Sequence, residues 1–169
     1  MRKAKKLLLI FTFIISVLSG VFMLSGQASA KTISANNLPI NNIHFMQSTA
    51  KNKTGDYTVL DNAVALKEGT LKPEELPQIR VWRDKDKKIW TLDHRRLIAF
   101  KLAGIKNVSV RWATEDEIKH DAFKMTTPNG GEAIDLLCPN SKTLTVKRAE
   151  DYSVWSLEYL KQIRSLYQG

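Results

Sequence analysis

The sequence has little cysteine and little histidine. Its 169 residues include one cysteine, Cys138, and three histidines. A single cysteine excludes an intramolecular disulfide and a zinc site built from several thiolates. We expect Cys138 to be a small buried apolar residue, because no neighbouring basic residue would stabilise its thiolate; a reactive nucleophile is the alternative. Stability must therefore come from an apolar core, and a chain of this length suits a single domain.

Long hydrophobic runs are absent except near the N-terminus. There the apolar run LLLIFTFIISVLSGVFML follows four basic residues and precedes ASA at residues 28–30. This order predicts a signal peptide over residues 1–30, so we expect an exported protein, secreted or periplasmic, with no stable membrane insertion after cleavage. Because the run approaches the length that spans a bilayer, an uncleaved N-terminal anchor is the alternative.

Acidic residues are fewer than basic ones, 17 against 26, and the formal net charge is +9. Removal of the signal peptide takes four basic residues and no acidic ones, which leaves a net charge of +5. This balance is compatible with a phosphate-rich partner or an anionic surface, and it is also ordinary for an exported protein.

Hydrophobic periodicity in the remaining chain predicts a mixed α/β fold with a small sheet flanked by helices. Capping-box spacing at Thr58 and Thr114 predicts two helix starts, and the alternation on either side of a charged turn at residues 84–87 predicts a hairpin. The predicted strands are 43–47, 79–83, 88–92, 107–112 and 142–147, and the predicted helices are 59–67, 94–103 and 114–123. Residues 31–42 are expected to be a flexible lead, residues 50–57 a turn or loop, and residues 124–134 a strand end, a turn and a resumed strand. A C-terminal amphipathic helix at 151–167, with Tyr159 and Leu166 on its apolar face, is expected to pack on the domain.

The stretch TLDHRRLIAFKLAGI, residues 91–105, carries the strongest functional signal. Asp93 and Gly104 are typical start and stop residues of a short helix. Arg95 and Arg96 then fall in its first turn, where the positive end of the helix dipole disfavours cations. We therefore expect an anion to compensate them, bound through the guanidinium groups and the free N–H groups of the helix start.

Two segments, LPQIRVWRDKDKKIWTLDHRRLIAFKLAGI and FKMTTPNGGEAI, resemble the ParB/sulfiredoxin-like superfamily. The resemblance is closest to the ParB-like domains of secreted and polymorphic bacterial toxins, and it predicts a ParB/sulfiredoxin-like domain over residues 43–148. It implies a phosphate site in the loop before the helix, where Arg95 and Arg96 occupy the two arginine positions of the motif. His94 falls where sulfiredoxins have their reactive cysteine, so sulfinic acid reduction is not expected.

The candidate site therefore has two parts. We predict Asp93, Arg95, Arg96, Thr126 and Thr127 as phosphate-binding residues, the threonines being supplied by the stretch TTPNGGE. His94 and Glu132 are the candidate catalytic residues, His94 because an imidazole titrates near neutral pH. The alternative is that both arginines pair with nearby carboxylates and that TTPNGGE is only a turn.

The function expected from these features is an exported domain that binds a phosphate-bearing ligand, with DNA or RNA as the favoured class. The related toxin domains imply a nuclease-type toxin or effector with a cognate immunity protein, and a divalent metal would be the cofactor of such an enzyme. The sequence displays no complete catalytic set and no histidine spacing typical of a metal site. The alternative function is a non-catalytic secreted module that binds a protein or an anionic polymer.

Overall fold

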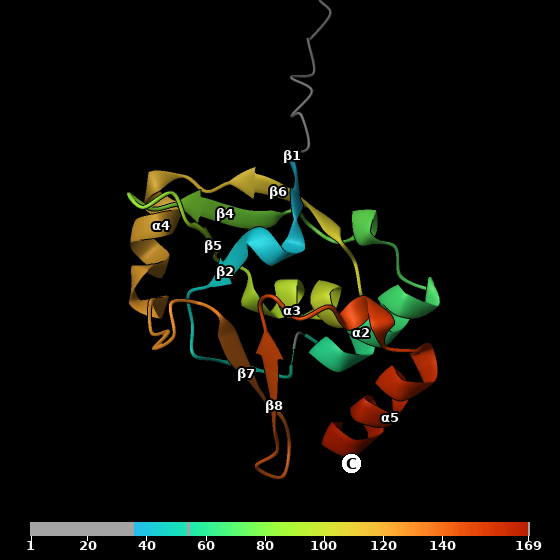
Figure 1. The fold of residues 1–169 in the computed structure, drawn as a ribbon. Helices are drawn as coiled ribbons and strands as arrows, with labels where there is room; N and C mark the ends of the chain where they lie inside the picture. Colours follow the sequence, from blue (N-terminus) through green and yellow to red (C-terminus); the bar gives the residue numbers. More distant parts are fainter. Residues whose placement is uncertain (1–35, 54, 169) are drawn as a thin grey trace, which may run out of the picture. The chain divides into compact units, whose positions relative to one another are not determined.

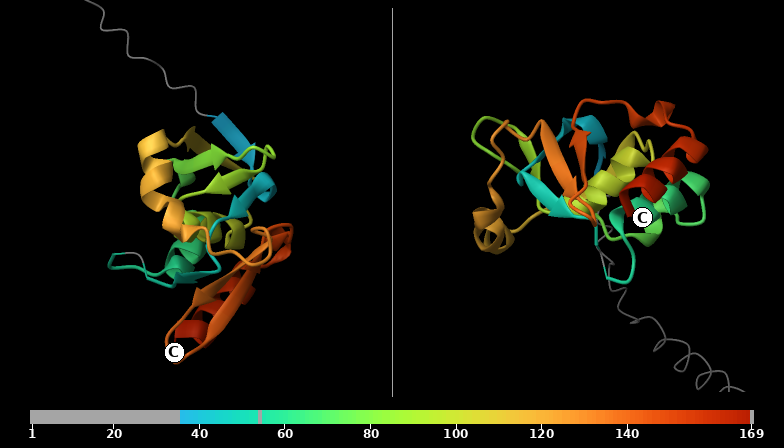
Figure 2. Two further views of the ribbon diagram at one scale, coloured as in Figure 1. Left: turned by 90° about the vertical axis from the view of Figure 1, so that its left-hand side faces the viewer. Right: turned by 90° about the horizontal axis from the view of Figure 1, so that it is seen from below.

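The computed structural model describes residues 36–53 and 55–168, which form a mixed α/β fold with two sheets and four α-helices (Figures 1 and 2). This confirms the predicted fold class, although the expected small sheet is two sheets of five and three strands. The predicted signal peptide lies outside the described residues. None of the helices within the described ranges has the length and apolarity needed to cross a membrane.

The five-stranded sheet has the order β1-β6-β4-β5-β2. The predicted hairpin is confirmed, since β4 and β5 pair antiparallel with Trp82 opposite Trp90. After α3 (His94–Leu102), β6 returns to the same sheet on the other side of β4 and runs parallel to β4. The strands are β1 (Asn36–Pro39), β2 (Ile43–Phe45), β4 (Ile79–Arg83), β5 (Ile89–Thr91) and β6 (Asn107–Trp112).

The flexible lead predicted for residues 31–42 is wrong for its second half. Residues 36–39 form β1, which pairs antiparallel with β6, and residues 40–42 form a 3-10 helix, η1. Ile40 is buried in the main core. The asparagine-rich composition suggested disorder, but the hydrogen-bonding edge of β6 supplies partners that the local sequence does not reveal.

The second sheet consists of β3 (Thr49–Lys51), β7 (Ala133–Leu137) and β8 (Thr143–Lys147). The last strand predicted from the sequence is present as β8, and it forms an antiparallel hairpin with β7. β3 lies at the start of the stretch that was predicted to be a loop. β3 has three residues, pairs parallel with β7 and buries only Ala50. It is too short to show the alternation by which a strand is found in a sequence.

Helix α3 (His94–Leu102) runs through the centre of the fold, against the five-stranded sheet (Figure 1). α2 (Val59–Glu68) packs on α3, and α5 (Leu157–Gln168) packs on α2. Both capping boxes predicted from the sequence are present, at the start of α2 and at the start of α4 (Glu115–Asp121). Because α3 is covered on several sides, Leu97, Ile98 and Leu102 are fully buried.

The C-terminal helix differs from the prediction in its start and its buried face. Asp151 caps a short 3-10 helix, η4 (Tyr152–Val154), and α5 begins only at Leu157. Leu160 is the buried residue of α5, whereas Tyr159 and Leu166, predicted to be on the packing face, are 44% and 58% exposed. The chain is not helical between η4 and α5. The residues that α5 buries therefore differ from those expected for one continuous helix over residues 151–167.

The turn before β7 offers a matched test of this fold. Gly130 and Gly131 both have positive φ, but a Cβ on Gly131 would lie 2.7 Å from Trp90 Cζ3 and 2.8 Å from Phe45 O. A Cβ on Gly130 would meet nothing closer than 3.8 Å. We expect Gly130→Ala to cost about 1–2 kcal/mol of unfolding free energy from backbone strain. Gly131→Ala should cost about 1–3 kcal/mol more from overpacking, measured by urea denaturation. Equal losses in the two variants would contradict the close packing of this turn on β2 and β5.

Candidate functional site

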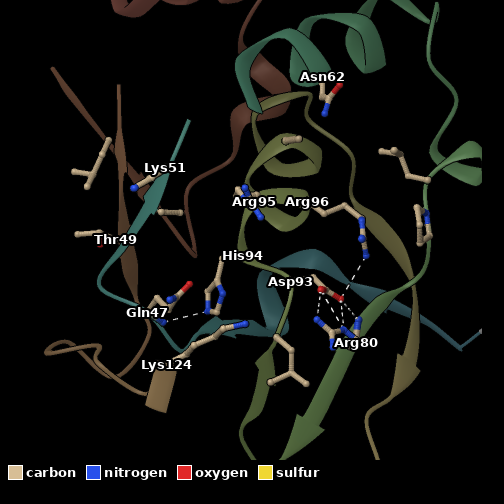
Figure 3. Close-up of a pocket in the computed structure, with 16 residues that line it drawn as sticks. Gln47, Thr49, Lys51, Asn62, Arg80, Asp93, His94, Arg95, Arg96 and Lys124 are labelled. Carbon is tan, nitrogen blue, oxygen red and sulfur yellow. Dashed lines mark hydrogen bonds and ion pairs between the residues drawn. The ribbon is translucent and has the colours of Figure 1, made fainter. Parts of the chain in front are cut away.

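A pocket of about 650 Å³ opens at the start of α3, between this helix and β3 (Figure 3). Most of its charged lining residues are basic, and one carboxylate, Asp93, lies among them. His94 lines the same pocket from the first turn of α3. The charged residues of the lining are Lys51, Arg80, Asp93, Arg95, Arg96 and Lys124.

Asp93 occupies the cap position of α3 but does not cap the helix. Its Oδ1 accepts a hydrogen bond of 2.7 Å from Arg80 Nη2, and its Oδ2 accepts one of 2.8 Å from the backbone N–H of Arg80. Burial of the Asp93 carboxyl opposes ionisation, yet these hydrogen bonds and the charges of Arg96 and Arg80 hold its pKa below the usual value. Asp93 is therefore an ionised partner of Arg80, and not a direct phosphate-binding residue as the sequence predicted.

The rotation of Asp93 toward Arg80 leaves the start of α3 open. The first intrahelical bond runs from Leu97 N to Asp93 O, and the backbone N–H groups of His94, Arg95 and Arg96 have no acceptor within the described residues. A side-chain cap would normally satisfy one of these donors. Several N–H groups and the positive end of the helix dipole therefore meet at the pocket.

His94 is a fixed, neutral hydrogen-bonding group. It is 4% exposed, and its Nε2 accepts hydrogen bonds from the backbone N–H groups of Met46, at 3.0 Å, and Gln47, at 3.1 Å. Burial and the charge of Lys124 lower the pKa of His94 to about 3. Because Nε2 accepts twice, the ring proton is on Nδ1, which has no partner in the described part of the chain. The predicted proton shuttle is thus wrong: His94 can offer an N–H donor to the pocket but does not titrate near neutral pH.

The two arginines of the motif have different surroundings. Arg96 is partly buried and donates to Gln78 O at 2.9 Å, and its Nη1 lies 3.4 Å from Asp93 Oδ2. Arg95 is exposed and donates to the backbone carbonyl of Lys53 at 2.5 Å, and it forms no ion pair within the described residues. Arg96 is therefore neutralised from within, as the alternative interpretation expected, whereas the charge of Arg95 is available to a ligand.

Two lysines complete the pocket without having been predicted. Lys51 comes from β3, is exposed, and has no ion-pair partner in the described ranges. Lys124 comes from a 3-10 helix, η3 (Ala122–Lys124), and its Nζ lies 2.8 Å from Asp121 Oδ1. Neither lysine shares a motif or a spacing with the arginines, so only the tertiary fold brings them together (Figure 3).

The predicted second part of the site does not line the pocket. Thr127 Oγ1 donates to Asn129 Oδ1 and accepts from Gly131 N, so it organises its own turn. Thr126 Oγ1 accepts from Ser48 N at 3.1 Å and so holds the loop that binds His94. Glu132, a predicted catalytic residue, instead forms an ion pair with Arg148 Nη2 at 2.9 Å. TTPNGGE is thus a structural turn, as the alternative interpretation expected.

Within the described ranges, no group of three or more His, Cys, Asp or Glu side chains is placed to hold a metal ion. No known protein family, curated protein or solved structure matches this chain. The geometry of the pocket is therefore the basis for its function.

His94 gives the pocket a testable pH dependence. The unfolded imidazole has its ordinary pKa of about 6.5, whereas the folded one has a pKa of about 3, so the unfolded state binds more protons between these values. The contribution of His94 to the unfolding free energy is fully present above pH 6.5 and is lost as the pH falls toward 3, by about 1.4 kcal/mol per pH unit.

We expect His94→Gln, whose amide oxygen can accept from the same N–H groups without titrating, to remove this slope. His94→Ala should lose stability at every pH, by about 1–3 kcal/mol for each buried N–H left without an acceptor. The measurement is urea denaturation of the three proteins between pH 4 and pH 7. The same acid slope in wild type and His94→Gln would contradict the assignment of a neutral His94.

Proposed function

We propose that this chain is an exported, ParB-like domain that binds a phosphate-bearing ligand, with nucleic acid as the ligand class, at the start of α3. The observation that carries the proposal is the convergence of hydrogen-bond donors on one pocket. These donors are the N–H groups of the first turn of α3, Nδ1 of His94 and the guanidinium of Arg95. Phosphate oxygens accept such donors, and their charge is favourable at a helix N-terminus.

The imidazole supports an anionic ligand more strongly than the helix start does by itself. The His94 side chain is almost fully buried and fixed, and its Nδ1 is open to the pocket, because Asn52 Nδ2 is the one fully buried side-chain atom without a hydrogen-bond partner in the described residues. A ligand oxygen in the pocket would satisfy Nδ1 together with the backbone donors beside it. Since Nδ1 donates from a neutral ring, we expect this contact to persist across the physiological pH range.

The distribution of charge supports a polymer. Lys51 and Arg95 are exposed and lie outside the internal ion pairs that hold Arg80, Arg96 and Lys124. Exposed cations beside a phosphate site suit a backbone that continues past it. The basic balance of the sequence and its resemblance to toxin-associated domains favour the same ligand class, and the predicted signal peptide supports export.

Cleavage of the ligand is not part of this proposal. In-line attack on a phosphodiester needs a general base or a metal-bound water in addition to donors that stabilise charge. His94 already accepts two hydrogen bonds at Nε2, and Glu132 is held by Arg148 outside the pocket. The pocket therefore supports binding by itself.

Substitution of the arginines separates ligand binding from stability. Arg95→Ala should fold like the wild type and weaken binding of a single-stranded oligonucleotide of about ten nucleotides by about 10- to 100-fold, because one charge-assisted contact is lost. Arg96→Ala should instead lose about 1–3 kcal/mol of unfolding free energy, because Gln78 O and Asp93 lose a buried partner. Fluorescence anisotropy and urea denaturation provide the two measurements.

The matched control is Arg164→Ala, which removes the same side chain from α5, outside the pocket. We expect this variant to bind within about twofold of the wild type, since a remote charge acts only through screened, long-range attraction. Binding by the wild type should also weaken with salt, with a log–log slope of about 0.7 per contacted phosphate. Equal weakening in Arg95→Ala and Arg164→Ala would contradict a site at α3 and indicate a diffuse charge effect.

A further inference from the structure

An exposed aromatic side chain, Phe123, immediately precedes Lys124, which lines the pocket. Phe123, in η3, is 72% exposed, and the neighbouring Met125 is 42% exposed. Burial of a phenylalanine side chain normally stabilises a fold by about 1.5–3 kcal/mol, and most of that gain is forgone here. The stability of the fold therefore does not explain the position of Phe123.

The segment that carries Phe123 is held firmly in place. Lys124 pairs with Asp121, which is almost fully buried, and Thr126 N donates to Met46 O at 2.9 Å. Thr126 Oγ1 accepts from Ser48 N on the same loop. This loop, residues 46–48, also supplies the two N–H groups that bind His94. Hydrogen bonds through residues 46–48 thus connect the segment that carries Phe123 to the imidazole of His94. Because both groups are held in place, a ligand that binds to both pays a smaller entropy cost.

One cation joins the ring to the pocket. Lys124 Nζ lies 5.8 Å from the centre of the Phe123 ring, and Lys124 lines the pocket. In Figure 3 its side chain extends beside His94. A ligand that combines a flat ring with a phosphate can therefore contact Phe123, Lys124 and the start of α3 together.

We infer that the ligand of this pocket is a single-stranded nucleic acid, one base of which stacks on Phe123 while an adjacent phosphate is bound at the start of α3. This inference rests on the proposed function. Base–aromatic stacking tolerates any sequence, because every base has a π-face. In a duplex, the faces of internal bases are covered by their neighbours and cannot reach Phe123. A protein partner fits less well, because Phe123 and Met125 offer far less than the roughly 800 Å² per partner of a stable protein interface.

Four ligands separate the contribution of the base from that of the phosphates. They are a fluorescently labelled single strand of about ten nucleotides, an abasic strand with the same phosphates, the corresponding duplex, and a mononucleotide. We expect wild type to bind the single strand most tightly in fluorescence anisotropy and competition measurements. The abasic strand should bind more weakly by about 5- to 150-fold, the effect of one stacked base.

Substitutions of Phe123 test the stacking contact without altering the phosphate site. Phe123→Ala should weaken binding of the single strand by about 5- to 150-fold and leave binding of the abasic strand unchanged. Phe123→Trp should retain tight binding, because the aromatic face remains. Tyr159→Ala, which removes an exposed aromatic from α5, is the matched control and should bind like the wild type.

Each contrary result points to a different failure. If the wild type binds the single strand and the abasic strand equally, or if Phe123→Ala binds like the wild type, stacking on Phe123 is refuted while phosphate binding at α3 stands. A mononucleotide that binds as tightly as the single strand, or a duplex that binds more tightly, would refute the single-stranded polymer. If no phosphate-bearing ligand binds, the proposed function fails as well.

Discussion

The interaction between Arg80 and Asp93 determines the character of the pocket. Asp93 stands where a helix cap belongs, but its carboxylate receives hydrogen bonds from both the side chain and the backbone of Arg80. This pair connects β4 to the start of α3 and leaves the first N–H groups of the helix without a protein acceptor. A helix end with open donors is unfavourable unless water or a ligand satisfies them. The same contact therefore fixes the position of α3 and leaves the N–H groups of its first turn open to the pocket.

His94, the first residue of α3, provides a second constraint. Its Nε2 holds the backbone N–H groups of Met46 and Gln47 and thereby ties α3 to the connection between β2 and β3. Thr126 binds the same loop from the segment that follows η3. Three segments far apart in the sequence are thus fixed around one imidazole. When Nε2 accepts the two backbone hydrogen bonds, the ring proton is on Nδ1. The hydrogen bonds that hold the ring in place therefore also leave Nδ1–H free to donate to a ligand, which makes the site pre-organised.

The division between Arg95 and Arg96 follows from the same geometry. Arg96 contacts Gln78 and Asp93 and so joins the ion pair between Asp93 and Arg80. Arg95, in contrast, is exposed to solvent. Adjacent side chains on a helix point about 100° apart, so the two guanidinium groups meet different surroundings. The sequence motif therefore combines a structural residue with a residue suited to ligand binding.

Local patterns were sufficient to predict much of the fold. The capping box at Thr58, the hairpin of β4 and β5, and the helix that ends before Gly104 each depend on residues close together in the chain, and each is present. β1 and β3 were missed because their stability comes from strands distant in sequence. At the site, the basic motif at the start of α3 was predicted, but the partners of its residues were not.

Those partners are set by tertiary contacts. Nothing near Asp93 in the sequence indicates that Arg80 would draw its carboxylate away from the helix start. The burial that lowers the pKa of His94 and the approach of Lys51 and Lys124 likewise depend on the packing of β3 and η3 against α3. For this reason the motif predicted from the sequence lies at the pocket, while the partners of several of its residues differ from those expected.

The most direct test of the central claim is a titration of the isotope-labelled protein with inorganic phosphate, followed by the amide resonances in nuclear magnetic resonance spectra. If an anion occupies the start of α3, the N–H resonances of His94, Arg95 and Arg96 and the Nδ1–H of His94 should shift together and saturate along one binding curve. Small, unsaturated shifts spread over exposed lysines, with these four resonances unchanged, would contradict the account.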